Sequence, residues 1–207
     1  MRAVAATLSI LVAALMLAQP ALAGKTADMV SVSDVSGDLN KLYLYNGKTA
    51  PWPDNSPIGQ ADYLDIKEVS ISKQKGTFVL TMTMYCDDLL ADVALTPGTN
   101  AMGWVHFLDT NLDGSSDFML CVAWYGNGFE SCLTVLGPTP IDLEPPRMSI
   151  AGATFTQYVD ADMIGNPSSI ASTFCVIVDF SPHWQNIYGG VFWVDISDSF
   201  EPLVWPA

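Results

Sequence analysis

The chain of 207 residues is long enough to bury a sizeable core, and it is 50% hydrophobic but only 14% charged, which excludes general disorder. Its 22 acidic residues against 8 basic ones give a formal net charge of −14. Because there is no basic patch to neutralise phosphates, we expect no nucleic-acid partner, and a chain this acidic should attract divalent cations instead.

Residues 1–23 have the features of a signal peptide. Arg2 supplies a positive start, an uncharged and mostly apolar run follows over residues 3–18, and Ala21 and Ala23 give the A-x-A spacing that a signal peptidase requires. The run is short for a membrane span, which needs about 20 apolar residues, and we expect no span later in the chain. We therefore expect cleavage after Ala23 and a product that is secreted or held in the periplasm or cell envelope.

Residues 24–62 are predicted to be an irregular N-terminal segment that joins the domain, because turn-forming stretches such as SGD, NGK and PWPDNSP interrupt them. One short strand is expected there, at residues 41–45. Over residues 63–207, period-two patterns and turn signals dominate, and convincing helical periodicity is absent. The main strands are expected at residues 62–73, 77–86, 102–108, 118–124, 129–136, 154–159, 172–180 and 191–196.

Two of these strands carry the most information about packing. Residues 77–86 alternate apolar and threonine side chains, which predicts one buried face and one half-polar face. The buried face is expected to carry Phe78, Leu80, Met82 and Met84. In the preceding strand Val69 and Ile71 point inward while Ile66 has the opposite parity, so we predict a β-bulge near Lys67–Glu68.

Eight or nine short strands joined by loops predict an all-β fold, an antiparallel β-sandwich of the jelly-roll or immunoglobulin-like type, over residues 63–207. A short hairpin is expected around Ala151–Gly152. A single helical turn is expected in the stretch DADMIGNP, capped by Asp160 and ended by Gly165.

An even number of cysteines in an exported chain favours disulfides. The four are Cys86, Cys121, Cys132 and Cys175. If Gly126 and Asn127 form a two-residue turn, the flanking strands pair in a register that places Cys121 opposite Cys132. We predict this bridge and a second one, Cys86–Cys175, with four buried thiols as the alternative.

The stretch DTNLDGSSD, residues 109–117, has the spacing of a calcium-binding loop. Ca²⁺ takes about six to eight oxygen ligands, which a short loop supplies when acidic and amide side chains alternate and a glycine permits a sharp bend. The bend would lie at Gly114. The expected ligands are Asp109, Asn111, Asp113, the backbone carbonyl of Ser115, and Asp117.

Two features separate this loop from an EF-hand. Its twelfth position is Leu120 instead of a bidentate Glu, and its flanks are predicted strands. The loop resembles the calcium loops in β-hairpins of integrin-type propellers, which implies an ion site and not a fold. We predict a weak, structural Ca²⁺ site, with a polar hairpin tip that holds no metal as the alternative.

The sequence contains no G-x-S-x-G, H-E-x-x-H or phosphate-binding glycine motif. We expect His106 to be a core histidine of a strand, with a role in orienting Asp109 as the alternative. His183 lies in a loop with no neighbour that would make it a base. A jelly-roll hydrolase would need two carboxylates in one groove, and Asp179 and Asp195 are the candidates.

Two tryptophans in polar loops, Trp52 and Trp184, are candidates for stacking on a sugar. The stretch ADYLDIKEVSISKQKGTFVLTMTM, residues 61–84, resembles the opening of exported sandwich domains related to DOMON and family-nine carbohydrate-binding modules. That resemblance implies the fold, and no binding residue carries over from it.

We therefore interpret the chain as an exported, calcium-binding β-sandwich that acts as a non-catalytic recognition or envelope-associated module. Its partner would be a glycan or another exported protein. A carbohydrate-binding module and a jelly-roll hydrolase are the alternatives.

Overall fold

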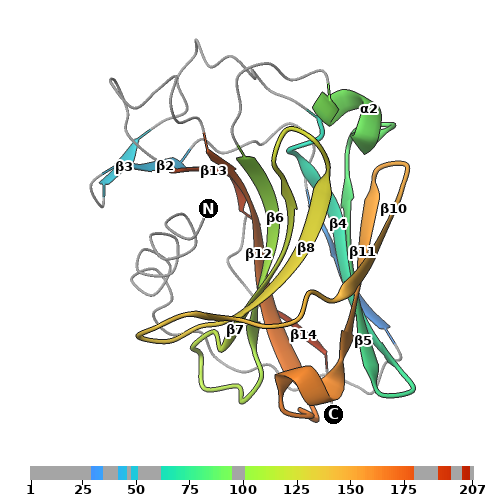
Figure 1. The fold of residues 1–207 in the computed structure, drawn as a ribbon, viewed down its shortest axis with the longest axis vertical. Helices are drawn as coiled ribbons and strands as arrows, with labels where there is room; N and C mark the ends of the chain where they lie inside the picture. Colours follow the sequence, from blue (N-terminus) through green and yellow to red (C-terminus); the bar gives the residue numbers. More distant parts are fainter. Residues whose placement is uncertain are drawn as a thin grey trace.

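The computed structural model describes residues 29–34, 42–45, 48–50, 62–94, 101–179, 191–196 and 202–205. Their strands form two antiparallel sheets that face each other, one of five strands and one of nine (Figure 1). The predicted antiparallel β-sandwich is confirmed, although the two sheets hold more strands than the eight or nine expected. Within this described part, no helix has the length and apolar character needed to cross a bilayer.

The five-stranded sheet runs in the order β1 (Met29–Ser33), β4 (Ile66–Gln74), β5 (Thr77–Met84), β11 (Thr154–Asp160) and β10 (Arg147–Ala151). β5 alternates as expected, with its even-numbered side chains buried. The pairing of β4 with β5 shifts between Ile66 and Glu68, which confirms the predicted bulge. Because of the extra residue, Ile66 and Val69 both point into the core despite their opposite parity.

The nine-stranded sheet contains most of the remaining chain. It runs in the order β3 (Lys48–Ala50), β2 (Leu42–Tyr45), β13 (Val191–Ile196), β12 (Ile170–Asp179), β6 (Ala101–Asp109), β7 (Phe118–Trp124), β8 (Phe129–Val135) and β9 (Ile141–Asp142), with β14 (Leu203–Trp205) also paired to β12. The main strand predictions thus match observed strands, with ends that differ by a few residues.

The β7–β8 hairpin has the register that its turn predicted. Gly126 adopts a φ of 86°, and Trp124 pairs with Phe129 across the turn. Cys121 lies opposite Cys132, and the two form a disulfide with Cα atoms 5.1 Å apart. The first predicted bridge is confirmed.

Two short helical elements lie between strands. The helix α2 (Leu89–Ala94) was not predicted, because six residues are too few to display helical periodicity. Its first turn is held by the Asp88 carboxylate, which accepts hydrogen bonds from the backbone N–H groups of Leu90 and Ala91. The predicted helical turn is present as η1 (Ala161–Ile164), but Asp160 does not cap it with its side chain and instead accepts a hydrogen bond from the Thr77 hydroxyl.

The strands that the sequence did not predict are short and lie at sheet edges. β1 and β3 fall in residues 24–62, where turn residues hide the alternation, and β9 has only two residues. An edge strand pairs on one side only, so its sequence is less constrained than that of a central strand. The N-terminal segment thus contributes strands to both sheets.

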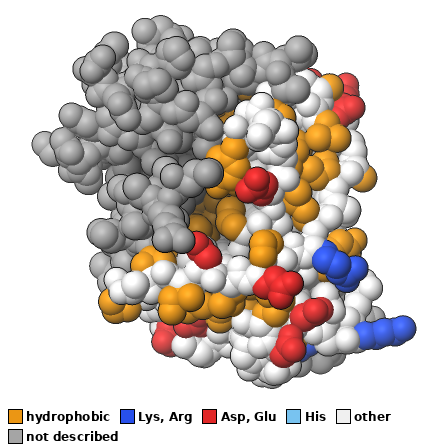
Figure 2. Space-filling model, viewed as in Figure 1, with side chains coloured by type: hydrophobic (Ala, Val, Ile, Leu, Met, Phe, Trp, Pro, Cys, Tyr) orange, Lys and Arg blue, Asp and Glu red, His pale blue; other side chains and the backbone are white. Residues whose placement is uncertain are grey.

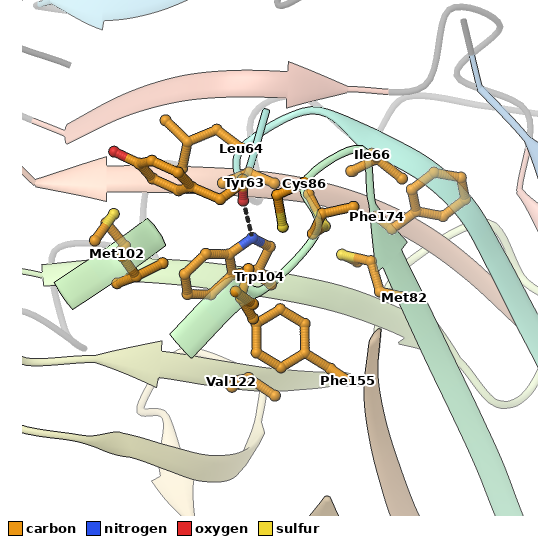
Figure 3. Packing of buried hydrophobic residues seen from close by; sticks show 14 of the residues in the cluster. Tyr63, Leu64, Ile66, Met82, Cys86, Met102, Trp104, Val122, Phe155 and Phe174 are labelled. Carbon is orange, nitrogen blue, oxygen red and sulfur yellow. Dashed lines mark hydrogen bonds between the residues drawn. The ribbon is translucent and has the colours of Figure 1, made fainter. Parts of the chain in front are cut away.

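The core between the sheets is built around Trp104 of β6, which is 1% exposed. Figure 3 shows its indole ring among side chains from both sheets, with the ring N–H donating to the Tyr63 carbonyl oxygen at 3.1 Å. The Phe155 ring of β11 lies 4.8 Å from the Trp104 ring, measured between centroids. This contact joins the two sheets.

The central strands of the nine-stranded sheet also bury side chains on the face that points away from the other sheet. Cys175 belongs to this outer cluster, together with Val105 and Cys121, whereas Cys86 belongs to the core between the sheets. Both Cys86 and Cys175 are buried, and they are not joined by a disulfide. The predicted bridge Cys86–Cys175 is wrong, because the sheet itself separates the two side chains.

Candidate metal centre

The loop of residues 109–117 connects β6 to β7 at one end of the nine-stranded sheet (Figure 1). Asp109 is the last residue of β6, and the Asp117 N–H donates to the Leu108 carbonyl at 2.8 Å, which closes the base of the loop. The Asp117 carbonyl in turn accepts the N–H of Leu136 at 2.7 Å, so the residue that follows β8 also holds the loop. The predicted ligand residues are therefore brought into one compact turn.

Asp109 organises the first half of the loop. Its carboxylate is almost buried, with the residue 8% exposed, and it accepts three backbone hydrogen bonds. Oδ1 accepts the N–H of Asn111 at 3.2 Å and of Leu112 at 2.6 Å, and Oδ2 accepts the N–H of Gly114 at 2.8 Å. The chain can wrap around one side chain in this way because Leu112 and Gly114 take left-handed φ values of 59° and 87°.

Asp117 organises the end of the loop. Its Oδ2 accepts both the N–H and the hydroxyl of Thr110, at 2.8 and 2.7 Å. Its Oδ1 accepts a longer bond of 3.4 Å from the Asn111 side-chain amide. Thr110 was not among the predicted site residues, and its sequence signal is a hydroxyl residue directly after the first aspartate.

The outer part of the loop is exposed and is held by short-range bonds. The Asn111 side-chain oxygen accepts the N–H of Asp113 at 2.9 Å, and Asp113 Oδ1 accepts the N–H of Ser115 at 2.8 Å. Both are the side-chain turns that Asn and Asp form with the backbone two residues on. The Asp113 carboxylate is thus the one closest to bulk water.

The donor groups suit a hard cation in chemical type but are not arranged as an acidic cage. Within the described residues, no three His, Cys, Asp or Glu side chains are gathered closely enough to hold a metal ion. The three loop carboxylates bind N–H and O–H groups of their own loop, and no Lys or Arg side chain of the described chain pairs with them. A carboxylate offers about four acceptor positions, so each keeps unused capacity for a further partner.

His106 lies three residues before Asp109 but does not touch the loop. It is 2% exposed, and its Nδ1 lies 3.0 Å from the Ser172 hydroxyl oxygen. Burial lowers its pKa to about 4. The interpretation as a core histidine is confirmed, and the alternative that it orients Asp109 is wrong.

The other candidate residues lie where the structure gives no side-chain geometry. Trp52, Trp184, His183 and the signal peptide fall outside the described residues. Asp179 and Asp195 lie on β12 and β13, which pair with each other, and only their backbone is described.

Comparison of the chain with protein-family models, curated proteins and solved structures finds no match in any of the three. The resemblance of residues 61–84 to DOMON-type sandwiches therefore stays a prediction.

Proposed function

We propose that the protein is an exported β-sandwich that binds Ca²⁺ in the 109–117 loop and acts as a non-catalytic recognition or envelope-associated module. The observation that carries this proposal is the uncompensated charge of the loop. Asp109, Asp113 and Asp117 lie within nine residues, they share no cationic partner in the described chain, and the whole protein already has a net charge of −14. A divalent cation would relieve that repulsion.

Charge elsewhere on the molecule supports the same view. On the face shown in Figure 2, acidic side chains are spread over the described surface, and basic side chains are confined to one side. Counter-ions of the protein therefore have to come from solution. The loop gathers three carboxylates within nine residues.

The residues that would hold the ion are Asp109, Asn111, Asp113 and Asp117 through their side chains and Ser115 through its carbonyl. Asp109 is already fixed by three N–H donors, so half of the loop is preformed. The outer carboxylate of Asp113 accepts only the Ser115 N–H, so it keeps free acceptor positions for the ion, but it is exposed to water. Leu120 cannot complete the site, because it is 0% exposed and points into the core.

The site should therefore be weak. Calcium modules that work outside cells have dissociation constants of about 10⁻⁴ to 10⁻³ M. Calcium at about ten times that constant adds about 1.4 kcal/mol to the free energy of unfolding. Mg²⁺ should do less, because it keeps its waters and rarely enters sites made only of protein oxygens.

Thermal melting of the purified protein tests the proposal. We expect millimolar Ca²⁺ to raise Tm by about 3–5 °C over EDTA-treated protein, and Mg²⁺ to raise it by clearly less. Asp113→Asn should abolish the calcium effect while keeping the acceptor oxygen for the Ser115 N–H. A Tm that changes neither with EDTA nor with added Ca²⁺ contradicts the proposal.

A matched control comes from the η1 turn. Asp162 is exposed there, so Asp162→Asn removes the same charge from another turn. This variant should keep the full response to calcium. If both variants lose it, calcium acts on the general charge of the protein and not on the loop.

The partner is tested separately from the metal. A glycan array run with and without Ca²⁺ checks the sugar-binding alternative, for which Trp52 and Trp184 are the candidates. Binding that disappears in Trp184→Ala, with Tm unchanged, would establish a carbohydrate-binding module.

A further inference from the structure

The ring of His106 lies inside the sandwich, 2% exposed, on the face of β6 that points toward the five-stranded sheet. The Ser172 hydroxyl oxygen lies 3.0 Å from His106 Nδ1, and the tautomer of the ring decides which of the two groups donates. In the neutral ring one nitrogen carries the proton, and a second proton would have to bind the other nitrogen inside the core.

Among the described residues, the surroundings of the ring contain no acidic side chain that would stabilise a positive charge. The hollow beside it is lined by Leu80, Met82, Trp104, Val122, Phe155 and Gln157, and it has no room for a water molecule. The strands β5, β7, β11 and β12 all pack around the ring, and among the described residues none turns a titratable or charged side chain toward it. Burial alone accounts for the lowered pKa of His106.

The polar side chain in this hollow is already occupied by other partners. The Gln157 amide nitrogen donates to the Cys121 carbonyl at 2.9 Å and to the Ser131 hydroxyl at 2.8 Å. Both of its hydrogens are used, and these bonds join β11 of one sheet to β7 and β8 of the other. Reorienting Gln157 toward a protonated ring would break this connection between the sheets.

We propose that His106 is an acid-sensitive lock on the sandwich: the closed core accepts only the neutral imidazole, so mild acid opens the two sheets. An imidazolium at this position would be an unpaired buried charge, which protein interiors do not tolerate. Opening the core lets water reach the ring. The lock belongs to the fold and does not depend on calcium.

Acid should lower the stability of the fold, because the unfolded chain binds a proton at His106 more readily than the folded chain does. The ring binds a proton in the unfolded chain below its usual pKa of about 6.5, and in the folded chain only near 4. The stability that His106 confers is therefore complete above about pH 6.5 and falls as the pH drops toward 4. Between about pH 7 and pH 4 the unfolding equilibrium constant should rise by about 100-fold from this group alone.

Urea unfolding from about pH 7 to about pH 4 tests the lock, with the wild type compared to His106→Gln and His183→Gln. Gln is neutral at all these pH values, so His106→Gln should lose this part of the pH dependence. His183→Gln should keep it, and that variant controls for the second of the two histidines in the chain. Equal pH dependence in wild type and His106→Gln overturns the proposal.

A second measurement does not require a variant to fold. NMR of the imidazole nitrogens in the wild type should show His106 neutral in the folded protein down to about pH 5. A folded protein at about pH 5 with a protonated His106 ring overturns the proposal.

Discussion

A single carboxylate, that of Asp109, determines the shape of the candidate metal loop. It sits at the end of β6 and collects N–H groups from positions two, three and five residues further on. The last of these comes from Gly114, whose φ of 87° lies in the left-handed region. The loop therefore depends on one acidic side chain and on one residue that takes this backbone conformation without strain.

Substitution of Gly114 tests that dependence. A Cβ at Gly114 would meet nothing within 4 Å, so any cost of Gly114→Ala comes from the backbone and not from a clash. We expect a loss of about 1–2 kcal/mol in the free energy of unfolding in EDTA, and a smaller loss for Gly114→Asn, since Asn tolerates this φ. Urea titration measures both.

Gly137 is the matched control for this substitution. It has equally open surroundings and no left-handed φ, so Gly137→Ala should be neutral or slightly stabilising. If Gly114→Ala is as harmless as Gly137→Ala, the loop does not hold Gly114 in the left-handed conformation described.

At the scale of elements, the sequence predicts what is local. The β7–β8 register followed from the turn at Gly126, because two strands joined by a tight turn have little choice of pairing. The bulge in β4 followed from a change of parity within one strand. The aspartate pattern likewise identified one loop, but it did not reveal that Thr110 would bind Asp117.

Features that depend on strands far apart in the chain could not be predicted from local sequence patterns. An even number of cysteines leaves Cys86 and Cys175 as the remaining pair. Whether two side chains can meet, however, depends on which face of its sheet each one occupies, and the alternation along each strand decides that. Phe174 and Val176 point into the core with Cys86, so Cys175 between them must point outward. Only the assembled sheet decides that question.

Alkylation followed by mass spectrometry checks this arrangement of cysteines. Native protein should take up no label, because Cys86 and Cys175 are buried and the pKa of Cys86 is raised to about 11 by burial, with nearby Asp92 adding to the rise. Protein unfolded in urea without reductant should take up two labels, one on each thiol. Reduction should raise the count to four by opening Cys121–Cys132.

The unreduced, unfolded sample decides between the two disulfide patterns. If the unfolded, unreduced protein takes up no label, Cys86 and Cys175 do form a disulfide. Labelling of Cys121 or Cys132 before reduction would instead contradict the disulfide between β7 and β8.

At the scale of the whole molecule, two sheets are joined by strands that are far apart in sequence. β11 pairs with β5, and β12 pairs with β6, so these neighbours in space are separated by long stretches of chain. Alternation identifies such strands but not their order, because every buried face is apolar. The contact between sheets is therefore best tested at a residue that touches both, and Trp104 is that residue.

Trp104→Phe should destabilise the sandwich more than the same change at Trp124. At Trp104, which is 1% exposed, the change removes the hydrogen bond to the Tyr63 carbonyl and leaves part of the ring volume empty beside Phe155. We expect a loss of about 2–3 kcal/mol, or about 5–10 °C in Tm. Trp124 lies on β7 and is only partly buried, so Trp124→Phe should cost less than about 1 kcal/mol.

Unfolding followed by far-ultraviolet circular dichroism compares the two variants without relying on tryptophan fluorescence. Equal losses at both positions would mean that Trp104 does not hold the sheets together, and the centre of the core would have to lie elsewhere.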